Sequence, residues 1–382
     1  MLKNLNIKIS IIFILAAGIL LRVYNIGFED LWYDEIISFW VASPNHSFSD
    51  SFKIHNYIEI APYTYHFLLK LFFKVFGYHV ETGRYVSAIF SCLSILTIPY
   101  IVKITNHNKA YLLSIFLVSL NIFLISYAQE IRVYSMLLFF VSLSLLFFFK
   151  VLKNDNNFLY FISFSLIAIF LHPFALLIFF SYILYAFLRF LKFKEINLRL
   201  NISLIFTGLI SVIFYLIFFY FLKQSNYNHE WIPQIDFKFY TNFFFSSFFG
   251  SRILGLIFLF FLIFLSIKNF KNLKNLDYLS VFFILIIVSY TLPIIFSYAF
   301  EPVLVSRYLI FVLIPVILLI SILTYEFNSS KISFLIAFFL CIVTILNMFT
   351  EQSFKQFYKP RDVHKPEYFK ALTYINKSNH KK

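Results

Sequence analysis

Two adjacent carboxylates are the first residues of this sequence that could do chemistry. Asp34 and Glu35 follow Trp32, and residues 29–35 hold four acids in seven positions, although only 13% of the chain is charged. A carboxylate held next to a bound hydroxyl can remove its proton as a general base. Taken alone, the stretch also fits a solvated loop at the start of a helix, so the rest of the chain must decide between these two interpretations.

Three further groups of polar residues could share a site with these acids. They are Glu130 with Arg132, the loop from His229 to Asp236, and Glu301 with Arg307. Together they would supply a base, a second acid and fixed cations. This set suits transfer of a group from a phosphorylated lipid, because the base takes a proton from an incoming hydroxyl and the cations neutralise the phosphate that leaves.

The motifs of several other kinds of chemistry are missing. The chain has only seven glycines and neither a P-loop nor a Rossmann glycine pattern, which excludes a pump driven by its own ATP. It also lacks the H-E-x-x-H and G-x-S-x-G motifs. Cys92 and Cys341 both lie in apolar runs and indicate no disulfide. We therefore expect neither a cofactor nor a metal site.

The elements that must position the polar residues are membrane helices. Apolar residues make up 61% of the chain, with 57 Phe and 26 Tyr, and runs of about 18 or more apolar residues recur. Backbone groups in lipid must be satisfied within each segment, which favours helices. The sequence therefore predicts an all-α polytopic membrane protein in which the N-terminal run, signal-like in composition, is retained as the first helix.

The apolar runs predict about eleven transmembrane helices in one domain over residues 1–350. We expect these helices at 7–26, 85–104, 110–127, 133–149, 158–171, 174–191, 202–222, 248–267, 279–300, 309–325 and 332–349. The outer loop 29–84 carries the acidic motif, and residues 351–382 form a short polar tail. In the loop, residues 62–77 place Lys70 and Lys74 on one face of an amphipathic helix that would lie in the interface. His172-Pro173 is interpreted as a helix break rather than a ligand site.

The distribution of lysine and arginine predicts the orientation. Basic residues cluster after the second, fourth, sixth and eighth spans, so the positive-inside rule puts these loops and the N-terminus in the cytoplasm. The acidic loop then faces the extracytoplasmic side. The net charge of +14 is attributed to topology and anionic lipid, and not to nucleic acid. Eleven spans put the basic tail outside: either the count is wrong by one, or, as we favour, earlier helices set the orientation.

Several motifs, in order along the chain, resemble the polyprenyl-phosphate-dependent glycosyltransferases of the GT-C superfold. The resemblance is to family 39 and the aminoarabinose-transferase-like group, which includes the protein O-mannosyltransferases. The matching segments are Leu31-Trp32-Tyr33-Asp34-Glu35, residues 62–77, Arg84-Tyr85-Val86-Ser87-Ala88, Tyr127-Ala128-Gln129-Glu130-Ile131-Arg132-Val133-Tyr134 and Ser306-Arg307-Tyr308-Leu309. One departure is Ala61-Pro62-Tyr63, where the group has His-Pro-Pro; the histidines nearby are His55 and His66.

The resemblance implies roles for the acids. Asp34 corresponds to the first-loop acid that activates or orients the acceptor, and Glu35 is the neighbour that could share this work. Glu130 corresponds to the second-loop acid that supports the site. The alternative for Glu130 is a local salt bridge with Arg132 that caps a helix.

The cations are candidates for binding the donor phosphate. Arg132 and Arg307 match the motifs, with Tyr308 beside them, and the alternative for Arg307 is snorkelling at the interface. Further phosphate candidates, from charge and predicted side alone, are Lys53, Arg84 and Arg252.

The expected function is that of an integral membrane glycosyltransferase of the inverting type, a hexosyl- or pentosyltransferase. It would move a sugar from a polyprenyl-phosphate donor to a hydroxyl of a lipid, glycan or protein on the extracytoplasmic face. The rivals are a flippase or transporter for a lipid-linked sugar, a polymerase or ligase that uses pyrophosphate-linked donors, and a structural membrane subunit.

Overall fold

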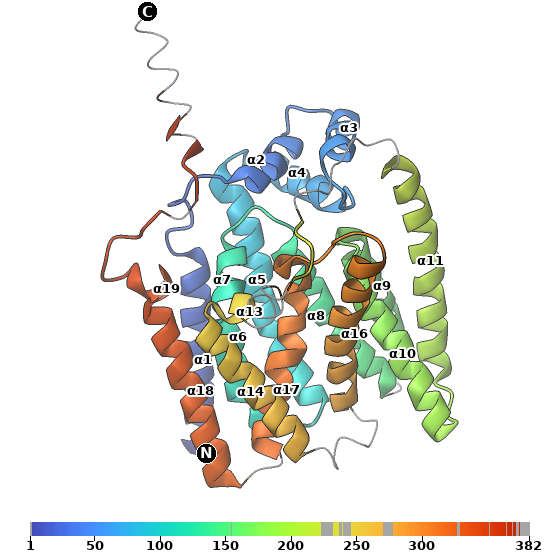
Figure 1. Ribbon diagram of the computed structural model, residues 1–382, viewed down its shortest axis with the longest axis vertical. Helices are drawn as coiled ribbons and strands as arrows, with labels where there is room; N and C mark the ends of the chain where they lie inside the picture. Colours follow the sequence, from blue (N-terminus) through green and yellow to red (C-terminus); the bar gives the residue numbers. More distant parts are fainter. Residues whose placement is uncertain are drawn as a thin grey trace, which may run out of the picture.

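The fold consists of helices that stand side by side and a cap of shorter helices at one end (Figure 1). The computed structural model describes residues 2–153, 155–222, 232–236, 239, 246–269, 278–326, 329–350, 352–363, 365–368, 370–371 and 374. Every regular element within these ranges is a helix. The predicted all-α fold class is therefore confirmed.

Each predicted span corresponds to one helix or to a pair of helices. They are α1 (Leu2–Val23), α5 (Val80–Ile104), α6 (Tyr111–Ser119) with α7 (Ile122–Ala128), α8 (Tyr134–Leu152), α9 (Phe158–Leu171), α10 (Ala175–Phe193), α11 (Leu198–Leu222), α14 (Arg252–Lys268), α16 (Tyr278–Ala299), α17 (Leu313–Glu326) and α18 (Ser330–Thr350). Shorter elements are η1 (Asn108–Ala110), α13 (Ser246–Phe249), η2 (Ser306–Val312) and α19 (Gln352–Lys355).

Fewer of these helices than eleven are long and apolar enough to cross a membrane alone. Within the described ranges seven pass by length and composition, or eight if the pair formed by residues 108–119 and α7, bent by 52°, counts as one span. The helix α9 is apolar but has only 14 residues. The chain is thus a polytopic membrane protein. Within the described ranges, however, not every predicted span is a helix long enough to cross a membrane by itself.

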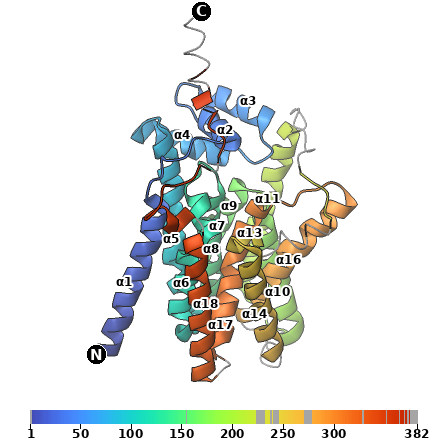
Figure 2. The same cartoon turned by 60° about the vertical axis from the view of Figure 1, so that its left-hand side comes forward.

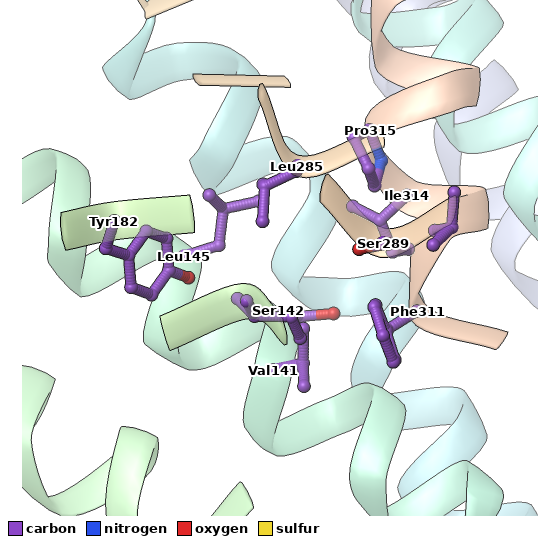
Figure 3. A pocket seen from close by; sticks show the side chains of 11 residues that line it. Val141, Ser142, Leu145, Tyr182, Leu285, Ser289, Phe311, Ile314 and Pro315 are labelled. Atoms are coloured by element: carbon purple, nitrogen blue, oxygen red, sulfur yellow. The ribbon is translucent and has the colours of Figure 1, made fainter. Parts of the chain in front are cut away.

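The helices α8 and α17 form the centre of the bundle. In the apolar 18-residue stretch of each helix, 72% of the residues are buried in α8 and 89% in residues 306–325. The corresponding share is 28% in α11 and in α18. The centre is closely packed, because the cavity between α8, α10, α16 and α17 measures only about 10 Å³ (Figure 3). Such a cavity holds at most one water molecule, so this part of the core offers no room for a lipid chain.

The outer loop forms a cap of three helices at the end of the bundle opposite the N-terminus (Figures 1 and 2). They are α2 (Tyr33–Val41), α3 (Phe48–Ile58) and α4 (Thr64–Phe76). Lys70 and Lys74 are expected to share one face of α4, but Lys74 is exposed whereas Lys70 is buried. Its long stem carries the ammonium inward, where it donates to the carbonyls of Ser43 and His46 and to the hydroxyl of Ser51. Lys70 therefore ties α4 to α3 and to the turn between α2 and α3.

A buried arginine supports the break between α6 and α7. Arg22 of α1 is fully buried and donates to the carbonyls of Val118, Ser119 and Gly18 and to the Ser91 hydroxyl. A break in a membrane helix frees carbonyls that need new donors, and Arg22 supplies them. Gly18 permits the close approach, because a Cβ there would lie 2.9 Å from the Cβ of Ser119.

Replacing Arg22 with methionine should therefore destabilise the bundle. Each buried carbonyl left without a donor costs about 1–3 kcal/mol. The measurement is the midpoint of thermal unfolding of the purified protein in detergent. Arg252→Met, which removes an exposed arginine at the start of α14, is the control and should melt like the wild type. Equal melting of both variants would contradict this role of Arg22.

Candidate active site

Four segments that are far apart in the sequence meet beneath the cap. The start of α2 carries Asp34 and Glu35, and the turn between α7 and α8 carries Glu130 and Arg132. The short helix η2 brings Arg307 and Tyr308, and the tail brings Lys365. Ion pairs join all four segments, so the structure gathers most of the polar residues that the motifs single out.

Asp34 lies between two arginines. Its Oδ2 atom is 3.2 Å from Nη2 of Arg307 and 3.8 Å from Nη2 of Arg132. The Asp34 side chain is 20% exposed and that of Arg307 is 16% exposed. The Arg307 guanidinium also lies 5.5 Å from the centre of the Trp32 ring. Arg307 is therefore held in an ion pair, and does not snorkel as a lone interfacial cation.

Arg132 is fixed by three groups of the cap. Its Nη1 atom lies 3.0 Å from the Ser38 hydroxyl, 3.0 Å from the Glu59 carboxylate and 3.1 Å from the Asp34 carbonyl. Sequence reasoning did not assign a role to Glu59 or Ser38, since neither stands in a motif. Glu130 and Arg132 do not form the local salt bridge considered above. Glu130 pairs with Lys365 of the tail, and Arg132 pairs with Asp34 and Glu59 of the cap.

Glu35 and Arg84 form a buried ion pair that serves the scaffold. The two side chains are 0% and 1% exposed, and Nε of Arg84 lies 3.1 Å from Oε1 of Glu35. The other Arg84 donors reach Oε2 of Glu35 and the carbonyls of Ile26, Glu29 and Asp30. An arginine has five N–H donors, so Arg84 has none left for a phosphate, and its assignment as a phosphate candidate is corrected.

The oxygens of Glu35 are occupied as well. Oε1 also accepts a hydrogen bond of 2.9 Å from the backbone N–H of Ile131, and Oε2 lies 2.8 Å from Nζ of Lys365. Burial alone would raise the pKa of Glu35, but Lys365 and Arg84 outweigh it and hold that pKa below its ordinary value. Glu35 therefore remains an anion that holds the turn between α7 and α8, and it is not free to take a proton.

Glu130 has one engaged and one unengaged oxygen. Its Oε1 atom lies 3.3 Å from Nζ of Lys365, while Oε2 is buried and has no hydrogen-bond partner within the described part of the chain. Burial raises the pKa of Glu130 above its ordinary value, although Lys365 acts in the opposite direction.

An aromatic group lies beside the arginines. The Tyr308 ring is 4.9 Å from that of His172 and 6.3 Å from that of Tyr134. His172 ends α9, and its Nδ1 accepts a hydrogen bond from the N–H of Phe174, so the predicted helix break is confirmed. Burial, followed by the charges of Arg132 and Arg307, lowers the pKa of His172 to about 3, and this imidazole is neutral.

The other candidates lie elsewhere. Lys53 is exposed on α3, where its charge acts on Asp50. Arg252 is exposed at the start of α14, and Glu301 is exposed after α16. His229 and Glu230 of the predicted polar loop lie outside the described residues.

Two histidines of the cap lie together near the site. The rings of His55 and His66 are 4.9 Å apart, and Nε2 of His55 lies 2.7 Å from the carbonyl of Ala61. Ala61 stands at the position of the histidine in the His-Pro-Pro motif named above. Burial lowers the pKa of both. In the described ranges no three His, Cys, Asp or Glu side chains are grouped so that they could hold a metal ion.

Two crystal structures of ArnT from Cupriavidus metallidurans are similar to this chain. The apo structure has a TM-score of 0.57 at 12% identity and covers 86% of this chain and 61% of that one. The structure described as bound to undecaprenyl phosphate has a TM-score of 0.54 at 13% identity, with 87% and 62% covered. The chain thus spans about three fifths of their length. No protein-family model and no curated protein matches the sequence. The likeness shows the fold alone, which this chain shares with the two ArnT structures.

Proposed function

We propose that this protein is a membrane glycosyltransferase that takes its sugar from a polyprenyl-phosphate donor. The observation that carries the proposal is the carboxylate of Asp34 between two arginines, 3.2 Å from Arg307 and 3.8 Å from Arg132. The setting supports it, because the fold resembles a protein described as bound to undecaprenyl phosphate. The alternative interpretation of Asp34 as a solvated loop residue does not account for the two arginines beside its carboxylate.

In the proposed reaction the acceptor hydroxyl attacks the anomeric carbon of the donor sugar. The new bond joins the acceptor oxygen to that carbon, and the bond from the carbon to the phosphate oxygen breaks. Asp34 takes the hydroxyl proton, and the polyprenyl phosphate leaves with the electron pair. Arg307 and Arg132 stabilise the charge that develops on the phosphate. A single displacement inverts the anomeric centre.

The remaining residues fall into two groups. Tyr308 stands beside Arg307 and would line the phosphate site. Glu130 stands at the edge of the site and would support it. Lys53 and Arg84 are left out of the proposed site, since one is exposed on α3 and the other uses all its donors within the protein.

We further propose that the site faces the extracytoplasmic side and that the N-terminus is cytoplasmic. The N-terminus and the cap lie at opposite ends of the bundle (Figure 1), and the basic loops after the even-numbered spans support this orientation. The acceptor would enter from the aqueous side beside α2, and the lipid tail of the donor would remain among the outer helices.

Replacing Arg307 with glutamine should weaken binding of polyprenyl phosphate. A hydrogen bond to a charged group is worth about 1.5–3 kcal/mol, so Kd should rise roughly 10- to 100-fold. The measurement is titration of the purified protein with undecaprenyl phosphate, with undecaprenol as the uncharged competitor. Arg252→Gln is the matched control and should bind like the wild type. Equal binding by both variants, or equal affinity for undecaprenol, would contradict a phosphate site at Arg307.

A further inference from the structure

The polar tail returns to the cap and crosses the outer end of α1. The ring of Phe357 lies 4.6 Å from that of Tyr24. Arg361 donates to the carbonyl of Asn25 and to Oε1 of Gln129, each at 3.2 Å, and its guanidinium lies 5.2 Å from the centre of the Phe28 ring. Asn25 and Arg361 are 336 positions apart in the chain. The tail is therefore fastened at several points, and residues 357–363 with Lys365 form a strap over the site.

Lys365 ends this strap between two carboxylates. Its ammonium lies 2.8 Å from Oε2 of Glu35 and 3.3 Å from Oε1 of Glu130, and its side chain is 16% exposed. Arg84 neutralises the charge of Glu35 but forms no ion pair with Glu130. Without Lys365 the pair would hold an uncompensated negative charge in a largely buried place, which is unfavourable.

Glu35 and Glu130 fix the turn between α7 and α8, which positions Arg132 beside Asp34. Glu35 accepts the N–H of Ile131, which lies inside this turn. Gly83 makes room for the Ile131 side chain, because a Cβ there would lie 2.8 Å from the Ile131 Cδ1 atom. A shift of Glu35 or Glu130 would thus move Arg132, and a misplacement of about 1 Å in an active site can reduce the rate about 100-fold.

We propose that Lys365 is a positioning residue of the active site and that the strap must be docked for sugar transfer. This inference rests on the proposed glycosyltransferase function. Lys365 of the strap holds the carboxylates of Glu35 and Glu130 in place. These acids fix the turn between α7 and α8. The segment that the sequence marks as a separate tail is then a working part of the site.

The pH profile should report on this contact. Glu130 faces Lys365 from the strap, Glu35 from α2, Tyr127 from α7 and Arg132 from its own turn. Lys365 lowers the pKa of Glu130, so its loss lets Glu130 bind a proton at higher pH. The acidic limb of the activity profile should therefore move to higher pH when Lys365 is replaced.

The test compares Lys365→Met, Lys365→Arg and the control Lys370→Met, which removes an exposed tail lysine whose side chain is 72% exposed. Label transfer from a radiolabelled undecaprenyl-phosphate sugar is measured across pH in membranes with matched protein levels, and the melting temperature of each purified variant is measured in parallel. Lys365→Met should lose about 10- to 100-fold in rate and shift the acidic limb upward. Lys365→Arg should recover most of the rate, and the control should behave as wild type.

The outcomes separate the strap from the proposed function. If the wild type transfers label and Lys365→Met matches it in rate and pH profile, the strap proposal fails and the function stands. If Lys365→Met loses rate with an unshifted profile and Lys365→Arg fails to recover, the strap only stabilises the fold, and the positioning role is overturned. If the wild type transfers no label, the function fails and the strap proposal with it.

Discussion

Replacing Asp34 with asparagine should reduce sugar transfer by about 10²- to 10⁴-fold, which is the usual contribution of a positioned general base. The fold should survive, because the amide keeps the volume of the side chain and Arg132 stays neutralised by Glu59 at 3.0 Å. Arg307 loses its ion pair with Asp34 but is 16% exposed, so water can solvate it. The measurement is the initial rate of label transfer from an undecaprenyl-phosphate sugar.

The matched control for this prediction is Asp50→Asn. Asp50 belongs to the same cap, and its side chain is exposed and bonded to Ser47. The same chemical change there should leave the rate near that of the wild type. A rate for Asp34→Asn equal to that of this control would mean that Asp34 is only the counter-ion of two arginines.

Replacing Arg84 with methionine should destabilise the protein by about 3–5 kcal/mol, the cost of leaving one partner of a buried ion pair alone. Glu35 would remain buried with Lys365 as its one neighbouring cation among the described residues, and the carbonyls of Ile26, Glu29 and Asp30 would lose their donor. Lysine should not rescue this position, because an ammonium cannot reproduce the planar fork of donors. The measurement is again the thermal midpoint in detergent.

Arg189→Met is the control for the buried pair. Arg189 is 32% exposed and meets Glu195 at 3.8 Å, and such surface pairs contribute about 0–1 kcal/mol. If Arg84→Met instead melts like the wild type and binds undecaprenyl phosphate more weakly, Arg84 is a phosphate ligand, as its charge alone suggested.

The order of the helices could be predicted from the sequence because lipid imposes one strong rule. A segment that crosses the bilayer must be apolar and must satisfy its own backbone, so each apolar run marks a helix. The bend of 52° between residues 108–119 and α7 could not be predicted in this way. It depends on Arg22, which reaches the freed carbonyls of Val118 and Ser119 from another helix.

The site was harder to predict, because the sequence does not tell which charges are buried. Glu35 and Arg84 have the types expected of catalytic and phosphate-binding residues, yet they face each other at less than 2% exposure. Lys70 and Lys74 share a face by helical spacing, but spacing does not predict that the long Lys70 side chain is buried while Lys74 is exposed. Lys365 gave no signal, since it stands in a polar tail 230 or more residues from both of its partners.

The fate of a labelled sugar in proteoliposomes tests the central claim most directly. Vesicles containing the wild-type protein receive a radiolabelled undecaprenyl-phosphate sugar and a membrane extract as the pool of hydroxyl acceptors. We predict that the label leaves the carrier, appears on an acceptor and releases undecaprenyl phosphate, with little transfer by Asp34→Asn. A label that crosses the bilayer while still joined to its carrier would contradict the account, and the protein would then be a transporter of lipid-linked sugar.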